Sequence, residues 1–402
     1  MVKLSLIQFA PEISNKSGNL KKIEEFCKKS QGDIILLPEL ATTGYAYPNT
    51  ESLLPLADKL TQNQEIVKYF QDLASFRDSL IVVGLPEVSE QEGKVSLFNS
   101  VLAVDKNGIV EVYRKLHLFG REKKIFTPGS QKPPVFSFRT YKLSLLICFD
   151  WVFQELFRLL SLQGVQVVLH SANLVLPWCQ RSMIARALTN GLFIATANRI
   201  GREREGLDEL TFTGGTQVVS PQGELLGALN DDESILEVEF DPAQADKKTI
   251  GTNNDRIKDR REDIYKLEWV VKSSHDWEDL KKMAVKAKSN AYTPYSNFPV
   301  GAAVMDDRGF IYGGCNVENS SYGLTMCAER SAIFSMVEDK GRKIKKMVIA
   351  SNSGVYPCGA CLQVIAEFAD EAEILILNNN GDEKRCRLSD LMPHRFSKLD
   401  LT

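Results

Sequence analysis

The chain has 402 residues with 49 basic and 52 acidic side chains, a formal net charge of −3. This length predicts two domains, each long enough to bury a core of its own. The charge is nearly balanced, and we find no basic stripe of the kind that nucleic-acid binders present and no apolar run of membrane-spanning length. Composition therefore argues against nucleic-acid-binding and membrane-spanning classes.

The first segment, 1–9, is predicted to be a strand and not a secretory leader. Its apolar run is short, and Gln8 interrupts it. The chain has eight cysteines, and several of them are assigned thiolate roles below, which fits a reducing compartment. We therefore expect a cytoplasmic protein.

Three predicted strands in the first two thirds of the chain each end near a residue suited to catalysis. Strand patterns alternate with helical patterns, for example a helix over 19–29, which predicts an α/β or α+β fold. In chain order, the strands and their residues are 33–40 with Glu39, 100–104 followed by Lys115, and 143–147 followed by Cys148 and a helix over 152–160.

These three residues suit nucleophilic catalysis. A cysteine at a strand-to-helix corner is accessible and favoured as thiolate, so Cys148 is the candidate nucleophile. Glu39 can take its proton, and Lys115 can hold the oxyanion of a tetrahedral intermediate. Each residue alone has an ordinary explanation, because a Glu after a strand is usually solvated and a Cys there is usually packed. The hypothesis depends on their occurring together.

Together they resemble the Glu–Lys–Cys triad of the nitrilase superfamily, the carbon–nitrogen hydrolases. The resemblance covers nearly all of 1–262 and adds Glu122 as a second catalytic glutamate. It implies an αββα sandwich and a thioester intermediate. The context at 148–151 is similar to the amidase branches, which favours a small amide or carbamoyl substrate over a nitrile. The loop over 43–48 is expected to line the pocket, but no motif names the substrate.

The domain boundary is expected after a charged run over 255–263, which is interpreted as a solvated segment of the first domain. The preferred join is at 273–275, giving a hydrolase domain over 1–272 and a second domain over 273–402. Two hairpins are also predicted, with turns at 221–223 and 306–309.

Three cysteines in the second domain have the spacing of zinc ligands. Cys358 and Cys361 are one helical turn apart, so their thiolates share a face, and Cys327 supplies a third ligand. The fourth tetrahedral position is left to water, whose pKa falls to about 7. Glu329 is placed to carry protons and not to bind the metal. A structural zinc knot is the alternative, and the added C-x-E element favours catalysis.

This C-x-E…P-C-x-x-C pattern is a form of the zinc deaminase signature. With its flanking segments it resembles the small tetrameric cytidine deaminases over about 275–402. The resemblance implies a three-layer α/β/α fold, one Zn²⁺ per chain and a pocket at subunit contacts. It also implies substrate-binding roles for four residues: Phe298 on the pyrimidine ring, Asn316 and Glu318 on the ribose hydroxyls, and Phe396 at the roof of the site.

One departure from the deaminase family lies beside the cysteines. Leu362 stands where the family usually has Arg, so one cation that would draw charge from the thiolates is missing. Arg330 can still supply the other. We therefore expect deaminase activity, at a level that this substitution affects.

The whole sequence is interpreted as a bifunctional hydrolase with a place in pyrimidine metabolism. Its expected partners are small molecules, namely a pyrimidine nucleoside and an amide, carbamoyl or nitrile compound, together with further copies of the chain in an even-numbered homo-oligomer. One alternative is a monofunctional cytidine deaminase whose first half is an assembly scaffold. Nucleic-acid editing is disfavoured by the charge and by the ribose-binding pair.

Overall fold

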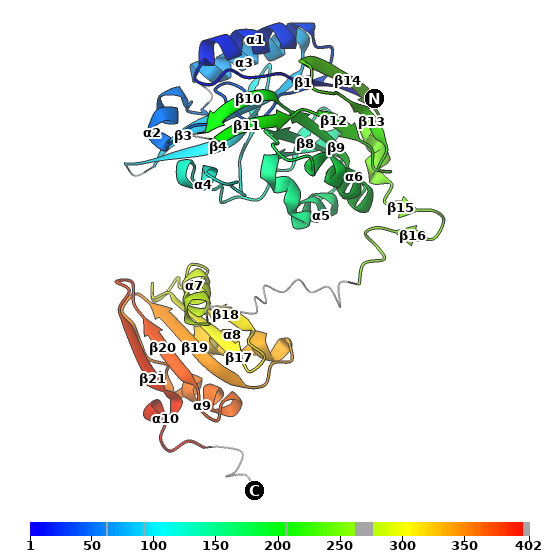
Figure 1. Ribbon diagram of the computed structural model, residues 1–402. Coiled ribbons are helices and arrows are strands. Elements are labelled where there is room, and N and C mark those ends of the chain that lie inside the picture. The colour runs from blue at the N-terminus through cyan, green and yellow to red at the C-terminus, as the bar shows by residue number, and fades with distance from the viewer. Residues whose placement is uncertain (62, 92, 206–207, 262–275, 397–402) are drawn as a thin grey trace. The chain divides into compact units, whose positions relative to one another are not determined.

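The computed structural model describes residues 1–61, 63–91, 93–205, 208–261 and 276–396 (Figure 1). The chain divides into two compact units, Met1–Arg260 and Arg261–Thr402. The join expected at 273–275 lies outside the described residues, so the division into 1–272 and 273–402 stays a prediction. No helix in the described ranges is long and apolar enough to cross a membrane.

The first unit contains two six-stranded sheets with helices outside them, the αββα sandwich that the sequence predicts (Figure 1). The first sheet has the order β14 (Ser234–Phe240), β1 (Val2–Gln8), β2 (Ile34–Leu36), β3 (Leu80–Gln91), β4 (Lys94–Asp105), β5 (Gly108–Arg114). The second has the order β13 (Leu225–Ala228), β12 (Gln217–Val219), β9 (Phe193–Asn198), β8 (Val167–Ala172), β7 (Tyr141–Ile147), β6 (Phe136–Phe138).

The main core of this unit lies between the two sheets. It joins side chains such as Leu4 and Leu36 of the first sheet to Leu145 and Val167 of the second. A further core packs Ile23 and other residues of α1 and α3 against the outer face of the first sheet.

The helices of this unit are α1 (Lys16–Lys29), α2 (Thr50–Leu53), α3 (Glu65–Arg77), α4 (Glu122–Ile125), α5 (Gln154–Leu162) and α6 (Cys179–Asn190). Two small ribbons pair β10 (Ile200–Glu205) with β11 (Asp208–Thr213) and β15 (Thr249–Ile250) with β16 (Asn254–Asp255).

Two predicted boundaries in this unit are corrected by the structure. The strand expected to reach residue 40 ends at Leu36, shortly before Pro38, which has no N–H to donate to the ladder, and the chain then turns at Leu40 with φ 46°. The helix expected from 152 begins at Gln154, after a 3-10 helix over Cys148–Val152. The helix expected over 19–29 is confirmed as α1, which starts at Lys16 because Asn15 caps the amide of Gly18.

The second unit is a five-stranded sheet with helices on both faces, the predicted three-layer α/β/α fold. Alternate residues of β17 point to opposite faces: Val304 joins the core with α8 and α9, and Met305 joins the core with α7. The sheet order is β18 (Ile311–Cys315), β17 (Val300–Asp306), β19 (Ile344–Ser351), β20 (Glu373–Leu377), β21 (Glu383–Arg387), and the helices are α7 (Asp276–Lys288), α8 (Ala328–Glu338), α9 (Gly359–Phe368) and α10 (Leu388–Leu391).

Both predicted hairpins are present. Strands β12 and β13 pair antiparallel around the turn at 221–223, and β17 and β18 pair antiparallel around the turn at 306–309. In each case a glycine with positive φ, Gly223 or Gly309, closes the turn.

Candidate active sites

The hydrolase candidates of the first unit come from both sheets. Strands β7, β8 and β9 are parallel, so the residues after them, including Cys148 and Asn173, meet at one edge of the second sheet. Glu39 follows β2 and packs closely on Gly84 of β3, where any Cβ would lie 2.5 Å from the Glu39 Cα. Lys115 follows β5 directly and is 1% exposed.

Lys115 is the centre of a buried charge cluster. Its Nζ lies 2.6 Å from Glu39 Oε1 and 2.8 Å from Glu122 Oε1. Asn99 Nδ2 also donates to Glu39 Oε1, at 2.7 Å, whereas Glu39 Oε2 is buried without a partner among the described residues. One oxygen of Glu39 is therefore fixed, and the other is free to accept a proton.

The charges of this cluster support one another. Burial alone would lower the pKa of Lys115, but Glu122 and Glu39 overcome it and hold that pKa above its ordinary value. Burial raises the pKa of Glu122, while the Lys115 ammonium opposes the rise. Burial and the negative charge of Glu39 raise the pKa of the Cys148 thiol well above 9. The expectation that Cys148 is accessible and favoured as thiolate is therefore wrong: the residue is buried, burial favours the thiol, and its attack requires a base beside it.

The backbone at Cys148 is unusual. Its φ is 37°, in the left-handed region that non-glycine residues rarely adopt. The Cys148 carbonyl accepts a hydrogen bond from His170 Nε2 at 2.9 Å, and His170 Nδ1 lies 3.2 Å from Thr196 Oγ1. Burial lowers the pKa of His170 to about 4, so this histidine is a neutral support for the strained turn.

Tyr45 is a site residue that the sequence motifs do not identify. Its hydroxyl donates to Glu122 Oε1 at 2.7 Å, and burial raises its pKa well above 10. The loop that carries it is held by Glu203, which accepts from the amides of Tyr45 and Ala46 and pairs with buried Arg199. The sequence signalled this loop only through the expectation that 43–48 lines the pocket. None of these residues is among those that line the Cys148 cavity, and only the fold brings Tyr45 to Glu122.

A cavity of about 270 Å³ opens at Cys148. The Cys148 Sγ lies 3.9 Å from the carbonyl oxygen of Asn173, which also lines the cavity. The other lining residues are Phe119, Phe149, Trp151, Val152, Leu174, Val175, Leu176 and Trp178. The nucleophile thus faces an apolar chamber, and the cluster around Lys115 is buried.

The three predicted metal ligands of the second unit come together. Cys327 and Cys358 are the N-cap residues of α8 and α9, and Cys361 lies in the first turn of α9. Their Sγ atoms all lie within 4.8 Å of one another, and Cys327 and Cys358 are 4.0 Å apart. Tetrahedral zinc with bonds of about 2.3 Å would separate two sulfurs by about 3.8 Å, so this donor set fits the ion.

The charges around the cysteines also suit a metal centre. A hydrogen bond with Cys361 is the largest cause that lowers the pKa of Cys327 to about 5, and Arg330 adds to it from 3.7 Å. Burial raises the pKa of Glu329, which lies in the first turn of α8 and is 5% exposed. Leu362 packs against the core of the unit and fills apolar space.

The four predicted substrate-binding residues of this unit lie in different surroundings. Asn316 is buried and holds the loop of Phe298, since its Nδ2 donates to the Phe298 carbonyl at 2.9 Å and its Oδ1 accepts from Val300 N at 2.8 Å. Glu318 accepts from the hydroxyl and amide of Ser296, and that hydroxyl is the largest cause of its lowered pKa. Phe298 and Phe396 are 36% and 58% exposed.

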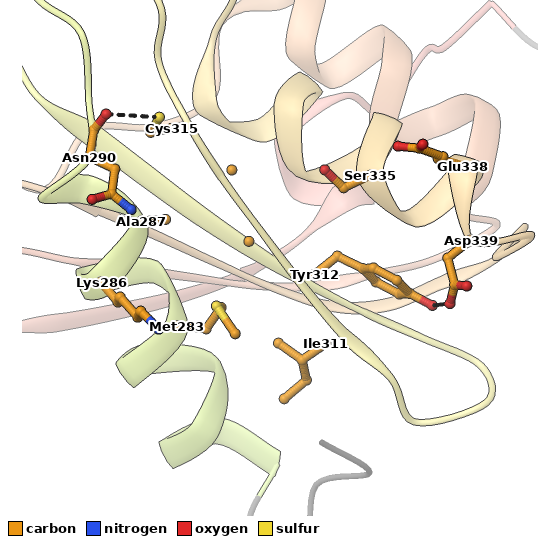
Figure 2. A pocket seen from close by; sticks show the side chains of 12 residues that line it. Met283, Lys286, Ala287, Asn290, Ile311, Tyr312, Cys315, Ser335, Glu338 and Asp339 are labelled. Atoms are coloured by element: carbon orange, nitrogen blue, oxygen red, sulfur yellow. Dashed lines mark hydrogen bonds between the residues drawn. The ribbon is translucent and has the colours of Figure 1, made fainter. Parts of the chain in front are cut away.

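A larger hollow of about 450 Å³ lies elsewhere in the second unit (Figure 2). It follows edge strand β18 between α7 and α8, with Met283, Tyr312 and Asp339 among its lining residues. None of the predicted ligands or substrate-binding residues lines it. The volume of a hollow alone therefore does not identify the active site of the second unit.

Comparison with known proteins assigns the first unit to a family. Residues 3–248 match the Carbon-nitrogen hydrolase family. A nitrilase of Pyrococcus abyssi is 38% identical over 269 residues, which cover 66% of this chain and 99% of the relative. The chain belongs to the carbon–nitrogen hydrolase family. An amidase from Nesterenkonia sp. has a similar structure, with a TM-score of 0.53, 27% identity, and coverage of 65% of this chain and 94% of the amidase.

The second unit matches another family. Residues 274–377 match the Cytidine and deoxycytidylate deaminase zinc-binding region. A cytidine deaminase of Sporosarcina psychrophila is 48% identical over 130 residues, 32% of this chain and 96% of the relative. This hydrolase therefore carries a cytidine deaminase domain in the same chain, and both halves are enzyme domains.

Proposed function

We propose that the chain hydrolyses a small amide, carbamoyl compound or nitrile at Cys148 and deaminates cytidine or deoxycytidine at its three-cysteine centre. For the first activity, the supporting observation is the buried contact of Lys115 with Glu39 and Glu122 beside a cysteine that faces a cavity. For the second, it is the convergence of three thiols with a buried glutamate.

For an amide or carbamoyl compound, the unpaired oxygen of Glu39 takes the proton of Cys148 as the sulfur attacks the carbonyl carbon. Lys115 stabilises the negative oxygen that forms. The C–N bond then breaks, and ammonia or an amine leaves with a proton returned by Glu39, leaving a thioester. Water, deprotonated by the same glutamate, cleaves the C–S bond to release a carboxylic acid and restore the thiol.

Glu122 and Tyr45 position Lys115 in this scheme. Glu122 Oε1 accepts hydrogen bonds from both the ammonium and the tyrosine hydroxyl. This fixes the direction in which the Nζ–H groups of Lys115 point, because another of these N–H groups already donates to Glu39.

In the deaminase reaction, Cys327, Cys358 and Cys361 would hold one zinc ion per chain. When bound, zinc supplies a Lewis acid that makes water acidic enough to attack the ring carbon. Glu329 would move two protons: the first, from the attacking water, to the ring nitrogen, and the second, from the hydroxyl then carried by the ring carbon, to the amine, which leaves as ammonia while that carbon becomes a carbonyl. Phe298 would stack on the base, and Phe396 would cover it. Asn316 and Glu318 retain hydrogen-bonding capacity for the ribose hydroxyls beyond their present partners.

The same proposal includes assembly into an even-numbered homo-oligomer. Four apolar side chains next to the substrate-binding segment are strongly exposed, and we call them the apolar rim: Tyr292, Tyr295, Tyr322 and Leu324. A second copy of the chain is the proposed cover, since the deaminase resemblance implies a pocket completed at subunit contacts. A closed symmetric oligomer would bury this surface on every copy.

Ammonia release from the full chain tests the two activities separately. Glu329→Ala should silence cytidine deamination, so ammonia released by this variant from amides, carbamoyl compounds or nitriles reports the hydrolase. The double variant with Cys148→Ala is the matched blank, in which this release should fall by several powers of ten. Release that persists in the double variant would refute the role of Cys148. No release from any compound would favour the scaffold alternative.

A further inference from the structure

Asp150 is a buried carboxylate that the mechanism above does not use. It lies two residues after Cys148, in the 3-10 helix that follows β7, and is 0% exposed. Burial of a carboxylate is costly unless donors surround it. Its Oδ2 accepts from the Tyr113 hydroxyl at 2.8 Å and from the Ile147 amide at 3.0 Å, and its Oδ1 lies 2.7 Å from His117 Nδ1 and 3.3 Å from the His117 amide nitrogen. These contacts join two segments that are far apart in the sequence.

One side of the carboxylate contacts the segment that carries Lys115. Tyr113 belongs to β5 of the first sheet, Lys115 follows that strand directly, and His117 comes two residues later. Lys115 therefore lies midway between the two residues that contact Asp150. A shift of either residue would move the ammonium with it.

The other side of the carboxylate closes the turn that carries Cys148. The amide it binds belongs to Ile147, the residue directly before Cys148, whose φ of 37° marks a strained turn. His170 donates to the Cys148 carbonyl, so the turn is held on both sides of the nucleophile. Asp150 thus bonds a turn at the end of the second sheet to a segment at the end of the first.

We propose that Asp150 is a positioning residue of the hydrolase, because it fixes the Cys148 turn to the Lys115 segment so that sulfur and ammonium approach the same carbonyl group. The inference rests on the proposed hydrolase function and adds a residue that touches neither the substrate nor the reacting atoms. A displacement of about 1 Å between groups that act together can lower a rate by about a hundredfold. Asp150 therefore acts on reactions that form an oxyanion more than on the reactivity of the thiol itself.

The first test compares two reactions of the Cys148 sulfur in the unmodified full chain and in Asp150→Asn. 4-Nitrophenyl acetate acylates the sulfur: the sulfur attacks the carbonyl carbon through an oxyanion, nitrophenolate leaves and a thioester forms. Iodoacetamide alkylates the same sulfur by displacing iodide, with no oxyanion for Lys115 to stabilise. An asparagine amide has only one acceptor oxygen, so it cannot replace all the contacts of the carboxylate. We expect acylation to slow by about ten- to a hundredfold relative to alkylation.

The burst of nitrophenolate reports acylation, and mass spectrometry of the peptide that contains Cys148 reports alkylation. Cys148→Ala is the blank for the burst. Asp58→Asn is the matched control, since it removes a carboxylate that contacts Lys16 at 2.7 Å elsewhere in the same unit, and it should leave the ratio of the two rates unchanged. Loss of both rates in equal proportion in Asp150→Asn would indicate a purely structural role and overturn the inference. No burst that depends on Cys148 in the unmodified chain would instead remove the proposed hydrolase function.

The second test removes one contact and keeps the carboxylate. Tyr113→Phe deletes only the hydroxyl that donates to Asp150, so it should lower the ratio of acylation to alkylation in the same direction by several-fold. This variant decides the question if Asp150→Asn fails to fold. An unchanged ratio in Tyr113→Phe would then overturn the assignment.

Discussion

In the first unit, the acid–base groups are almost fully buried and bonded to one another, with Glu39 at 0% and Lys115 at 1% exposure. In the second unit, Cys358 and Phe396 are exposed, and the apolar rim includes Tyr322 at 75% exposure. One unit therefore supplies the whole charge cluster proposed for the hydrolase, whereas several residues proposed for the deaminase site are exposed.

Burial accounts for this contrast. A lysine between two glutamates inside a protein must be assembled by the fold of one unit, because a buried charge without its partners is strongly destabilising. Thiols that hold a metal need only the start of two helices, and the metal itself completes the site. Under the proposed assembly, another subunit would complete the deaminase pocket, whereas the hydrolase charge cluster is already complete within one unit.

Loss of a metal ligand is expected to give the largest effect and to separate the two sites. Cys358→Ser should lower the zinc content well below one per chain and reduce cytidine deamination by more than about a hundredfold, with hydrolase turnover unchanged. Cys386→Ser, outside the cluster, is the matched control and should keep its zinc. Metal analysis and assays of both activities would test this prediction. Full zinc occupancy in the Cys358→Ser variant would contradict the proposed set of ligands.

Acid should destabilise the first unit through His170. The pKa of His170 is lowered to about 4 in the folded unit from an ordinary 6.5, so between these pH values the unfolded chain binds a proton and the folded unit does not. This contribution to the free energy of unfolding is fully present above pH 6.5. It is lost, by about 3 kcal/mol in total, as the pH falls towards 4. Urea unfolding followed by pulse proteolysis at several pH values would measure it.

The control for this effect is a pair of histidine variants. His170→Asn removes the titrating group, so its stability should change less between pH 6.5 and 4 than that of the unmodified chain. His394→Asn alters an exposed histidine of the other unit and should keep the full slope. An equal slope in the His170 variant would assign the acid sensitivity to other groups.

Charge introduced at the apolar rim should weaken assembly and with it the deaminase. Tyr322→Lys is expected to weaken association by about 1–2 kcal/mol, roughly tenfold, and to lower deamination at dilute protein concentration. Tyr322→Phe keeps the ring and should behave as the unmodified chain. Light scattering and activity against dilution would measure both; an active deaminase monomer would refute the need for a second copy.

The smallest effect is expected at Leu362. Leu362→Arg replaces a side chain packed on the core, so stability should fall by about 1 kcal/mol. Deamination at neutral pH should change by no more than a few-fold, because Arg330 Nη2 already lies 3.7 Å from the Cys327 sulfur. Kinetics of fully zinc-loaded protein would check this. A tenfold gain in the deamination rate would instead show that the absence of a second cation beside the thiolates limits the activity of the unmodified chain.

The sequence by itself identified both families. The C-x-x-C spacing brings Cys358 and Cys361 together at the start of α9, whereas the fold brings Cys327 to them. Glu39 and Cys148 follow strands that hydrophobic patterning predicts, and Lys115 follows β5, which was not predicted. Boundaries were less accurate, because Leu40 with its positive φ and the 3-10 helix at 148–152 depend on tertiary contacts.

What only the tertiary structure decided is which polar atoms remain without partners and which side chains face water. Tyr45 reaches Glu122 because Glu203 holds its loop, a contact between segments more than 150 residues apart. The Asn173 carbonyl lies 3.9 Å from the Cys148 sulfur because parallel strands β7 and β8 end at the same edge, and the side-chain amide of Asn173 is buried without a partner among the described residues. Hydrogen-bond satisfaction is a property of three-dimensional neighbours, so no pattern along the chain could have shown it.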